Sequence, residues 1–190
     1  PFGTDLYVAA AMGLGSVLSE RGDPEAARYA ADAVARCRAD GSDQQLAALL
    51  PTAAMVCWQV GALDQARAYA DEARPMHTDH KRIARVVLLS TCAGVELAAG
   101  DLDAATDYGR TADAEGSELG IEREMPLIRA ILARALLRRG DIAGAAETAG
   151  GCLETAAAMT VGFPLATGLE TVALVGAATG AAVDDLGALL

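Results

Sequence analysis

The chain has 190 residues, of which 53% are hydrophobic and 4% aromatic, and its 15 basic and 26 acidic residues give a net charge of −11. The apolar fraction supplies ample material for a core and excludes a disordered chain, and the abundance of alanine favours packed helices over sheets. An acidic surface without a basic stripe excludes binding to the phosphate backbone of DNA or RNA. We therefore expect an all-α protein that does not contact nucleic acid directly.

The predicted helices alternate along the chain as the first and second members of helix pairs. First helices are expected near residues 5–21, 44–60, 81–99, 124–139 and 164–179. Second helices are expected near residues 23–39, 63–75, 102–118 and 142–159, with the start of another after Ala182. The linkers between pairs include "RADGSD" and "RPMHTDH", whose polar, Gly and Pro residues are typical of loops.

One glycine recurs at the turn inside every pair. It stands at Gly22, Gly61, Gly100, Gly140 and Gly180, at intervals of 39, 39, 40 and 40 residues. A fixed period of this length indicates a stacked-repeat protein. We expect each glycine to end the first helix in the left-handed conformation, which glycine adopts without a steric penalty.

Small residues recur on both sides of this glycine and predict close packing of the two helices. Seven residues before it stand Gly15, Ala54, Ala93, Ala133 and Ala173. Five residues after it stand Ala27, Ala66, Ala105 and Ala145, and Asp185 breaks the pattern. Asp23, Asp101 and Asp141 are expected to cap the second helices. Pro24 is expected in a first helical turn.

This pattern resembles the tetratricopeptide repeat, whose motif has a small residue on the first helix, Gly-Asp at the turn and Ala early in the second helix. The matching residues are Gly15, Gly22, Asp23 and Ala27 in one unit, and Ala93, Gly100, Asp101, Ala105 and Ala112 in another. The resemblance implies an α-solenoid with a right-handed superhelix, although the period exceeds the usual 34 residues by roughly five. It also implies one repeat domain over 1–190, with units of about 5–39, 44–77, 81–118, 124–160 and 164–190. We expect this domain to be a piece of a longer chain, because no polar helix caps its last repeat.

Two long segments carry a closer resemblance. "SELGIEREMPLIRAILARALLRRGDIAGA" and "FPLATGLETVALVGAATGA" are similar to the helical sensor region of large bacterial LuxR-type transcriptional regulators with an ATP-binding module. These regulators include the activator of the maltose regulon and related regulators of antibiotic pathways. The resemblance implies a cytoplasmic, ligand-sensing interaction module. The alternative is a tetratricopeptide scaffold for complex assembly that has no connection with transcription.

The sequence contains no motif that indicates a particular catalysed reaction. His77, Asp79 and His80 could contribute to a metal site, but no further ligand is specified, and we interpret "HTDH" as a solvated loop. The nucleophiles nearest to these histidines are Ser90 and Cys92, in the next helix. The chain lacks the Gly-Lys-Ser/Thr loop that binds nucleotide phosphates. We expect a non-enzymatic protein without catalytic residues, metal or cofactor.

The cysteines and the most apolar segment are assigned structural roles. Four scattered cysteines without a close pair are expected to be reduced and buried, as in cytosolic proteins; they are Cys37, Cys57, Cys92 and Cys152. Residues 163–183 carry Glu170 as their sole charge, but they are rich in Ala, Gly and Thr, which makes their transfer into a membrane unfavourable. We expect a buried helix there and no membrane contact.

The candidate binding site is the concave face that the first helices of stacked pairs would line. Carrying over the groove-facing positions of the repeat selects Met12, Ser16, Met55, Trp58, Gln59, Ser90, Gly94, Arg134, Arg138 and Glu170. Trp, Met and Arg are residue types that anchor interfaces. The alternative is that Met55 and Trp58 pack between helices and that the two arginines form a solvated face. The expected partner is a peptide or a protein, with a small-molecule effector as a second candidate; formation of a homodimer is left open.

Overall fold

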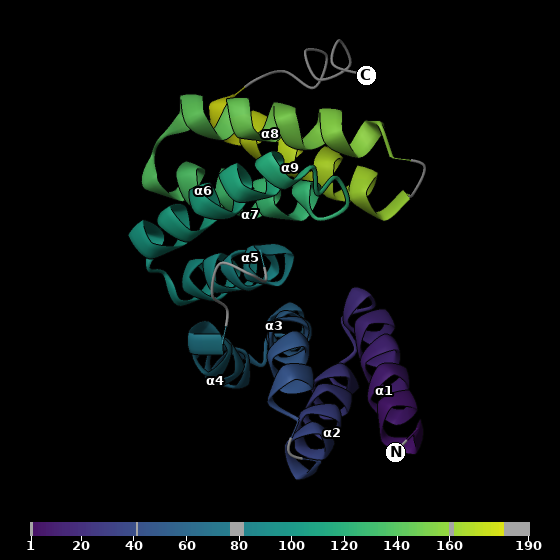
Figure 1. The fold of residues 1–190 in the computed structure, drawn as a ribbon. Helices are drawn as coiled ribbons and strands as arrows, with labels where there is room; N and C mark the ends of the chain where they lie inside the picture. The colour runs from purple at the N-terminus through teal and green to yellow at the C-terminus, as the bar shows by residue number, and fades with distance from the viewer. Residues whose placement is uncertain (1, 41, 77–81, 160–161, 181–190) are drawn as a thin grey trace. The chain divides into compact units, whose positions relative to one another are not determined.

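The structure is a computed structural model that describes residues 2–40, 42–76, 82–159 and 162–180. Every regular element in these ranges is a helix (Figure 1), which confirms the all-α prediction. The α-helices are α1 (Phe2–Glu20), α2 (Glu25–Ala39), α3 (Asp43–Gln59), α4 (Leu63–Ala73), α5 (Arg82–Ala99), α6 (Leu102–Leu119), α7 (Met125–Arg139), α8 (Ile142–Ala157) and α9 (Gly162–Thr179). A short 3-10 helix, η1 (Arg74–Met76), follows α4.

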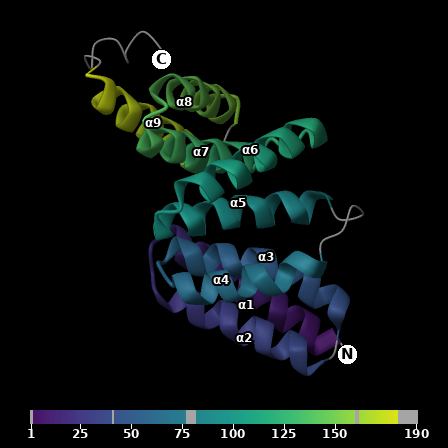
Figure 2. The same ribbon diagram turned by 90° about the vertical axis from the view of Figure 1, so that its left-hand side faces the viewer.

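The chain forms two compact units, Pro1–Val95 and Glu96–Leu190, whose boundary falls inside α5. In the first unit, α1 packs against α2 and α3, α2 packs against α3, and α3 packs against α4. In the second unit, α7 packs against α6, α8 and α9, and α8 packs against α9 (Figures 1 and 2). From α1 to α4 and from α6 to α9, helices that follow one another in the sequence are therefore neighbours in space.

The nine predicted helices are present, and their ends lie within three residues of the expected positions. The recurring glycine has a positive φ at every turn, between 69° and 90°, which confirms the left-handed conformation expected there. The predicted helix start after Ala182 lies outside the described residues.

Aspartates cap two of the second helices as predicted. The carboxylate of Asp101 accepts a hydrogen bond from the Ala104 amide at 3.1 Å, and that of Asp141 accepts one from the Gly144 amide at 3.0 Å. Asp23 differs, because its carboxylate accepts from the Glu25 amide, only two residues ahead. The N-cap position of α2 is taken by Pro24.

The small residue predicted five positions after the turn glycine is buried at that position in three pairs, and in the first pair the buried residue comes one position earlier. Ala66, Ala105 and Ala145 are completely buried, whereas in the first pair Ala26 is completely buried and Ala27 is not. The first turn of α2 is closed by tight i+3 bonds, from the Ala26 amide to the Asp23 carbonyl and from Ala27 to Pro24. Because a 3-10 turn needs about 3.0 residues instead of 3.6, the inward-facing position is reached one residue earlier.

The small residues predicted seven positions before the turn glycine lie on the first helices. Four of them are buried and one, Ala173, is exposed; the buried ones are Gly15, Ala54, Ala93 and Ala133. Ala173 lies on α9, which was predicted to be a buried helix. That prediction is wrong for one side of α9: Thr171 and Val175 are buried, while Leu169 and Leu174 are 38% and 44% exposed.

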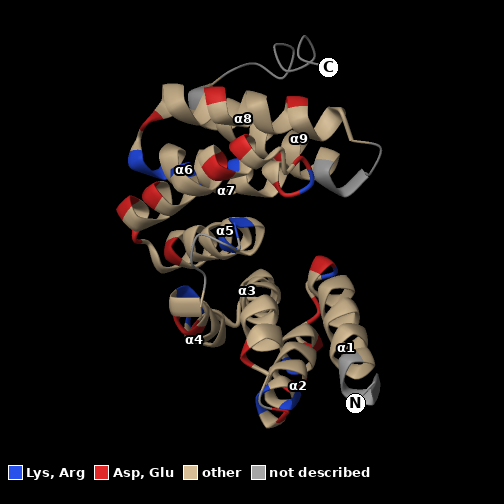
Figure 3. Cartoon of the chain, viewed as in Figure 1, with Lys and Arg blue, Asp and Glu red and all other residues tan. Residues whose placement is uncertain are grey.

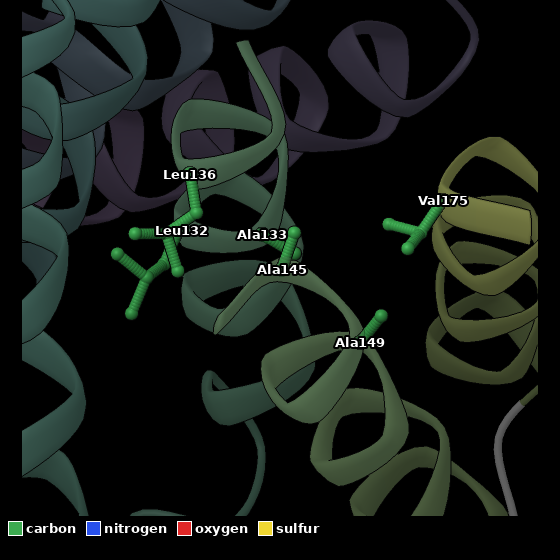
Figure 4. Packing of buried hydrophobic residues seen from close by; sticks show 6 residues of the cluster. All are labelled: Leu132, Ala133, Leu136, Ala145, Ala149 and Val175. Atoms are coloured by element: carbon green, nitrogen blue, oxygen red, sulfur yellow. The ribbon is translucent and has the colours of Figure 1, made fainter. Parts of the chain in front are cut away.

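A compact core joins the last three helices of the second unit. It contains Leu132, Ala133 and Leu136 of α7, Ala145 and Ala149 of α8, and Val175 of α9 (Figure 4). The alanines of α7 and α8 meet where the two helices cross, which lets the backbones approach closely. This packing fixes α8 beside α7 and thereby sets the position of the cleft described below.

Buried thiols are the other predicted feature of the core. All four cysteines are free and buried, as predicted.

No helix in the described part of the chain is both long enough and apolar enough to span a bilayer.

Candidate functional site

Met12 of α1 lines a shallow cavity in the first unit. The cavity, of about 300 Å³, lies between α1 and α3 and is also lined by Val8, Ala9, Gln45, Ala48 and Leu49. Met12 itself is 7% exposed, so it forms part of the floor. The next predicted residue on α1, Ser16, is half-buried, and its carbonyl accepts a hydrogen bond from Ser19 Oγ at 2.8 Å.

Trp58, the one tryptophan, is half-buried and lies against Gly94. A Cβ atom at Gly94 would stand 2.4 Å from Trp58 Cε2, so the indole occupies the space left by the missing side chain. Met55, one turn earlier on α3, is also half-buried. Trp58 and Gly94, both predicted as groove positions, are thus brought together as a packing contact.

The polar positions predicted in this unit are drawn into the fold. Gln59 is half-buried, and its side-chain amide lies 2.7 Å from Ser19 Oγ, a polar contact that ties α3 to α1. Ser90 on α5 is 7% exposed, which leaves little of its hydroxyl for a partner.

In the second unit, the predicted groove arginines have partners within the chain. Arg134 Nη2 lies 3.1 Å from Glu170 Oε1, an ion pair between α7 and α9 that joins two predicted positions. Arg138 Nη1 donates a 2.7 Å hydrogen bond to the Leu97 carbonyl. Arg138 is nevertheless exposed, so the rest of its guanidinium faces solvent.

A larger cleft, which the sequence analysis missed, lies between α6 and α8, with α7 as its floor. It encloses about 670 Å³, within the range of small-molecule and peptide sites. Its lining residues are Arg110 and Asp113 of α6, Arg129, Leu132 and Leu136 of α7, and Gly144, Ala146, Glu147, Thr148, Gly150, Gly151 and Glu154 of α8. A second cavity of about 360 Å³ continues along the same two helices and shares Arg129 with the first.

Arg129 bridges both walls of this cleft from its floor. Its Nε donates to Asp113 Oδ1 on α6 at 2.8 Å, and its Nη1 donates to the Gly151 carbonyl at 3.0 Å and to Thr155 Oγ1 at 2.6 Å on α8. The side chain is 24% exposed, so these charge-assisted bonds are partly shielded from water. One guanidinium thus sets the separation of α6 and α8 and divides the groove into two cavities.

The α8 wall of the cleft combines acidic and very small residues. Glu147 and Glu154 are exposed, and between them stand Gly150, where a Cβ atom would meet nothing within 4 Å, and Gly151, whose carbonyl is bonded by Arg129. Helix α8 carries no basic residue (Figure 3). The opposite wall carries Arg110, which is exposed. The sequence signal for this site was the run "GAAETAGG" on α8, together with one arginine inside the apolar stretch of α7.

Spacing and burial determine the chemistry of the potential metal ligands and of the thiols in the described residues. No group of three or more His, Cys, Asp and Glu in the described ranges could hold a metal ion, and the histidine-containing loop at 77–80 falls outside them. Burial raises the pKa of the Cys57 thiol to about 12 and that of Cys152 to about 11. Both thiols are thereby kept protonated, and the thiolate is the nucleophilic form.

No family model, no curated protein and no solved structure matches this chain. Its function is therefore inferred from its own residues and their arrangement.

Proposed function

We propose that the chain is a non-enzymatic helical-repeat module of the tetratricopeptide kind, stacked as a right-handed superhelix, that binds a peptide or protein partner. The observation that carries this proposal is the recurring turn, a glycine with positive φ every 39 or 40 residues, between helices that pack on their neighbours. In addition, α1 contacts α3 in the first unit and α7 contacts α9 in the second. Contacts between successive first helices are what a solenoid needs to line one face with them.

The partner-binding face that we propose is built from these first helices. Met55 and Trp58 supply apolar surface that is only half-buried. Arg138 supplies a guanidinium of which one N–H is used by a carbonyl of the chain. A planar guanidinium can bind a carboxylate of the partner through two parallel hydrogen bonds. A small anionic effector would use the same groups.

We further propose that the module is the sensing region of a bacterial transcriptional regulator and acts in the cytoplasm. This step rests on the resemblance of the two long segments to such regions. Each repeat of a solenoid touches only its neighbours, so a ligand bound across repeats would change their relative tilt. The change could control attached domains if the ligand binds the two states with different affinity. An ATP-binding module and a helix-turn-helix domain in the same reading frame would support this step, and their absence from it would favour the scaffold alternative.

The interaction role is tested with a display library of random twelve-residue peptides selected on the wild-type chain. Recovered peptides should bind the variant Arg134→Ala/Arg138→Ala more weakly than wild type. The matched control is Arg21→Ala/Arg123→Ala, which removes two exposed arginines elsewhere. Circular dichroism verifies the fold of each variant. Equal binding to both double variants would reject the arginine anchor, and failure to recover any peptide would reject the interaction module.

A further inference from the structure

We infer that the cleft between α6 and α8 is a docking site for an extended, basic peptide segment whose arginine or lysine residues are three positions apart. This inference rests on the proposed interaction function and names the chemistry of one partner and its place on the chain.

The narrow floor of the cleft at Arg129 favours an extended partner over a helical one. Arg129 contacts Asp113 on one wall and Gly151 on the other at the same time, so the floor is only as wide as one guanidinium with its hydrogen bonds. Lining residues of α8 extend from Gly144 to Glu154, about 15 Å of helix at 1.5 Å per residue. A single extended chain lies along such a narrow floor more readily than an α-helix, which is 10–12 Å wide.

The charge of the α8 wall selects a cation. Asp113 and Arg129 neutralise each other, Arg110 carries a positive charge on the α6 wall, and the charged groups of the α8 wall are the two glutamates Glu147 and Glu154. Among the described residues, neither glutamate side chain has a hydrogen bond or an ion pair. The net charge of −11 adds long-range attraction for a basic partner.

Arg110 on the opposite wall serves the backbone of the same partner. An extended polyproline-II segment has no internal hydrogen bonds, so its carbonyl groups are free to accept. The guanidinium of Arg110 offers five N–H donors and lines the cleft opposite α8. One extended peptide can therefore place its basic side chains against the glutamates of α8 and its backbone carbonyl groups against Arg110 of α6.

The spacing of the acids sets the spacing of the basic residues. Glu147 and Glu154 are seven residues apart on one helix, which separates them by about 10.5 Å along its axis. In a polyproline-II segment, residues i and i+3 point to the same side and are about 9.3 Å apart. Gly150 lies between the glutamates, and a Cβ atom there would meet nothing within 4 Å, which leaves room for the residues between the two cations.

The experiment measures binding of two fluorescein-labelled, end-capped peptides by fluorescence anisotropy. The probe is Ala-Arg-Pro-Leu-Arg-Pro-Ala, and the control peptide Ala-Pro-Arg-Leu-Arg-Pro-Ala has the same composition with the arginines two positions apart. We expect the probe to bind more tightly, and we expect its affinity to fall with added NaCl, because exposed ion pairs are screened. Equal affinity for the two peptides, or no binding of the probe at 1 mM (about −4 kcal/mol), would overturn the inference.

Two variants and one small amine complete the test. Glu147→Gln/Glu154→Gln should weaken the probe about fivefold to tenfold, the effect of two exposed ion pairs. The matched variant Asp32→Asn/Asp107→Asn also removes two exposed carboxylates and should bind like wild type. Gly150→Leu should abolish binding by filling the cleft. Spermidine that competes as well as the probe would show a general amine site and overturn the peptide assignment.

The outcome also separates this inference from the proposed function. Suppose that peptides from the display library bind Glu147→Gln/Glu154→Gln and Gly150→Leu as tightly as wild type but lose affinity for Arg134→Ala/Arg138→Ala. This result would leave the interaction module intact and reject this cleft as a docking site. Failure of the library and of the probe together would reject both.

Discussion

Trp58 lies in the space where Gly94 has no side chain, and a Cβ atom at Gly94 would come within 2.4 Å of the indole. The contact joins α3 to α5 in the first unit. Each residue therefore restricts what the other can be: the glycine admits the indole, and the indole fills a gap that would otherwise weaken the packing.

This contact predicts that Gly94→Ala changes the free energy of unfolding in opposite directions when Trp58 is present and when it is replaced by alanine. Gly94→Ala should lower the free energy of unfolding by about 1–2 kcal/mol, because overpacking outweighs the gain in helix propensity. In the background of Trp58→Ala, where the indole is gone, the same Gly94→Ala substitution should raise stability by up to about 1 kcal/mol.

Urea unfolding of the four proteins, followed by circular dichroism, measures the cycle. A Gly94→Ala substitution that destabilises both backgrounds equally would show that the indole does not fill this space. Because Trp58 has this structural role, a loss of partner binding in Trp58→Ala counts only after the effect on folding has been subtracted.

The helices were predictable because their signals are local. Gly100 and Asp101, for example, end one helix and cap the next through their own backbone and side-chain preferences. Ala27 was assigned one residue too far along, because the tight first turn of α2 depends on geometry that the spacing of residues does not show. The exposed side of α9 was missed for a similar reason, since apolar composition does not say which helices are close enough to cover it.

The candidate sites were less predictable because they depend on contacts between distant residues. The repeat pattern selected Arg134 and Glu170 as groove positions, but it did not show that they pair with each other. The only signal of Arg129 was a charge inside the apolar stretch of α7, and its role follows from partners on two other helices. Charge and propensity are read from single positions, whereas a cleft is set by the distance between helices.

Glycines on α8 and α9 should respond in opposite directions to alanine. A Cβ at Gly150 meets no atom within 4 Å, so Gly150→Ala should raise stability by about 1 kcal/mol through helix propensity alone. A Cβ at Gly168 would stand 3.1 Å from the Leu153 Cα, so Gly168→Ala should be destabilising. Thermal unfolding measures both, and a stabilised Gly168→Ala would mean that α8 and α9 can separate at no cost.

The buried thiols predict a loss of stability in alkaline solution. The pKa of Cys57 rises from 9.0 to about 12 and that of Cys152 to about 11, both because burial disfavours the thiolate. Above pH 9 the unfolded chain releases these protons while the folded chain keeps them, so stability falls with rising pH through the folded pKa values. The limiting slope is about 1.4 kcal/mol per pH unit for each thiol.

Urea unfolding at pH 8, 9 and 10 measures this slope, and Cys57→Ala should make it shallower than in wild type. The same burial predicts that the thiols react with a disulfide reagent at pH 8 only when the chain unfolds. Rapid reaction of all four thiols in the folded chain would contradict their burial.

Arg129 is predicted to hold α6 and α8 together through its charge and its forked geometry. Arg129→Leu removes three charge-assisted hydrogen bonds and leaves Asp113 without its partner, so it should lower the free energy of unfolding by about 1–2 kcal/mol. Asp113→Asn should cost less, because Arg129 keeps its two acceptors on α8 and the ion pair is about one-third exposed. Arg129→Lys should behave more like Arg129→Leu than like wild type, because a single ammonium cannot reach both walls in the geometry of a planar fork. Urea unfolding ranks the three variants, and hydrogen exchange should show faster exchange in α6 and α8 when the bridge is removed. A fully stable Arg129→Leu with unchanged exchange would mean that packing against α7 alone positions the two walls, and that the width of the cleft does not depend on this residue.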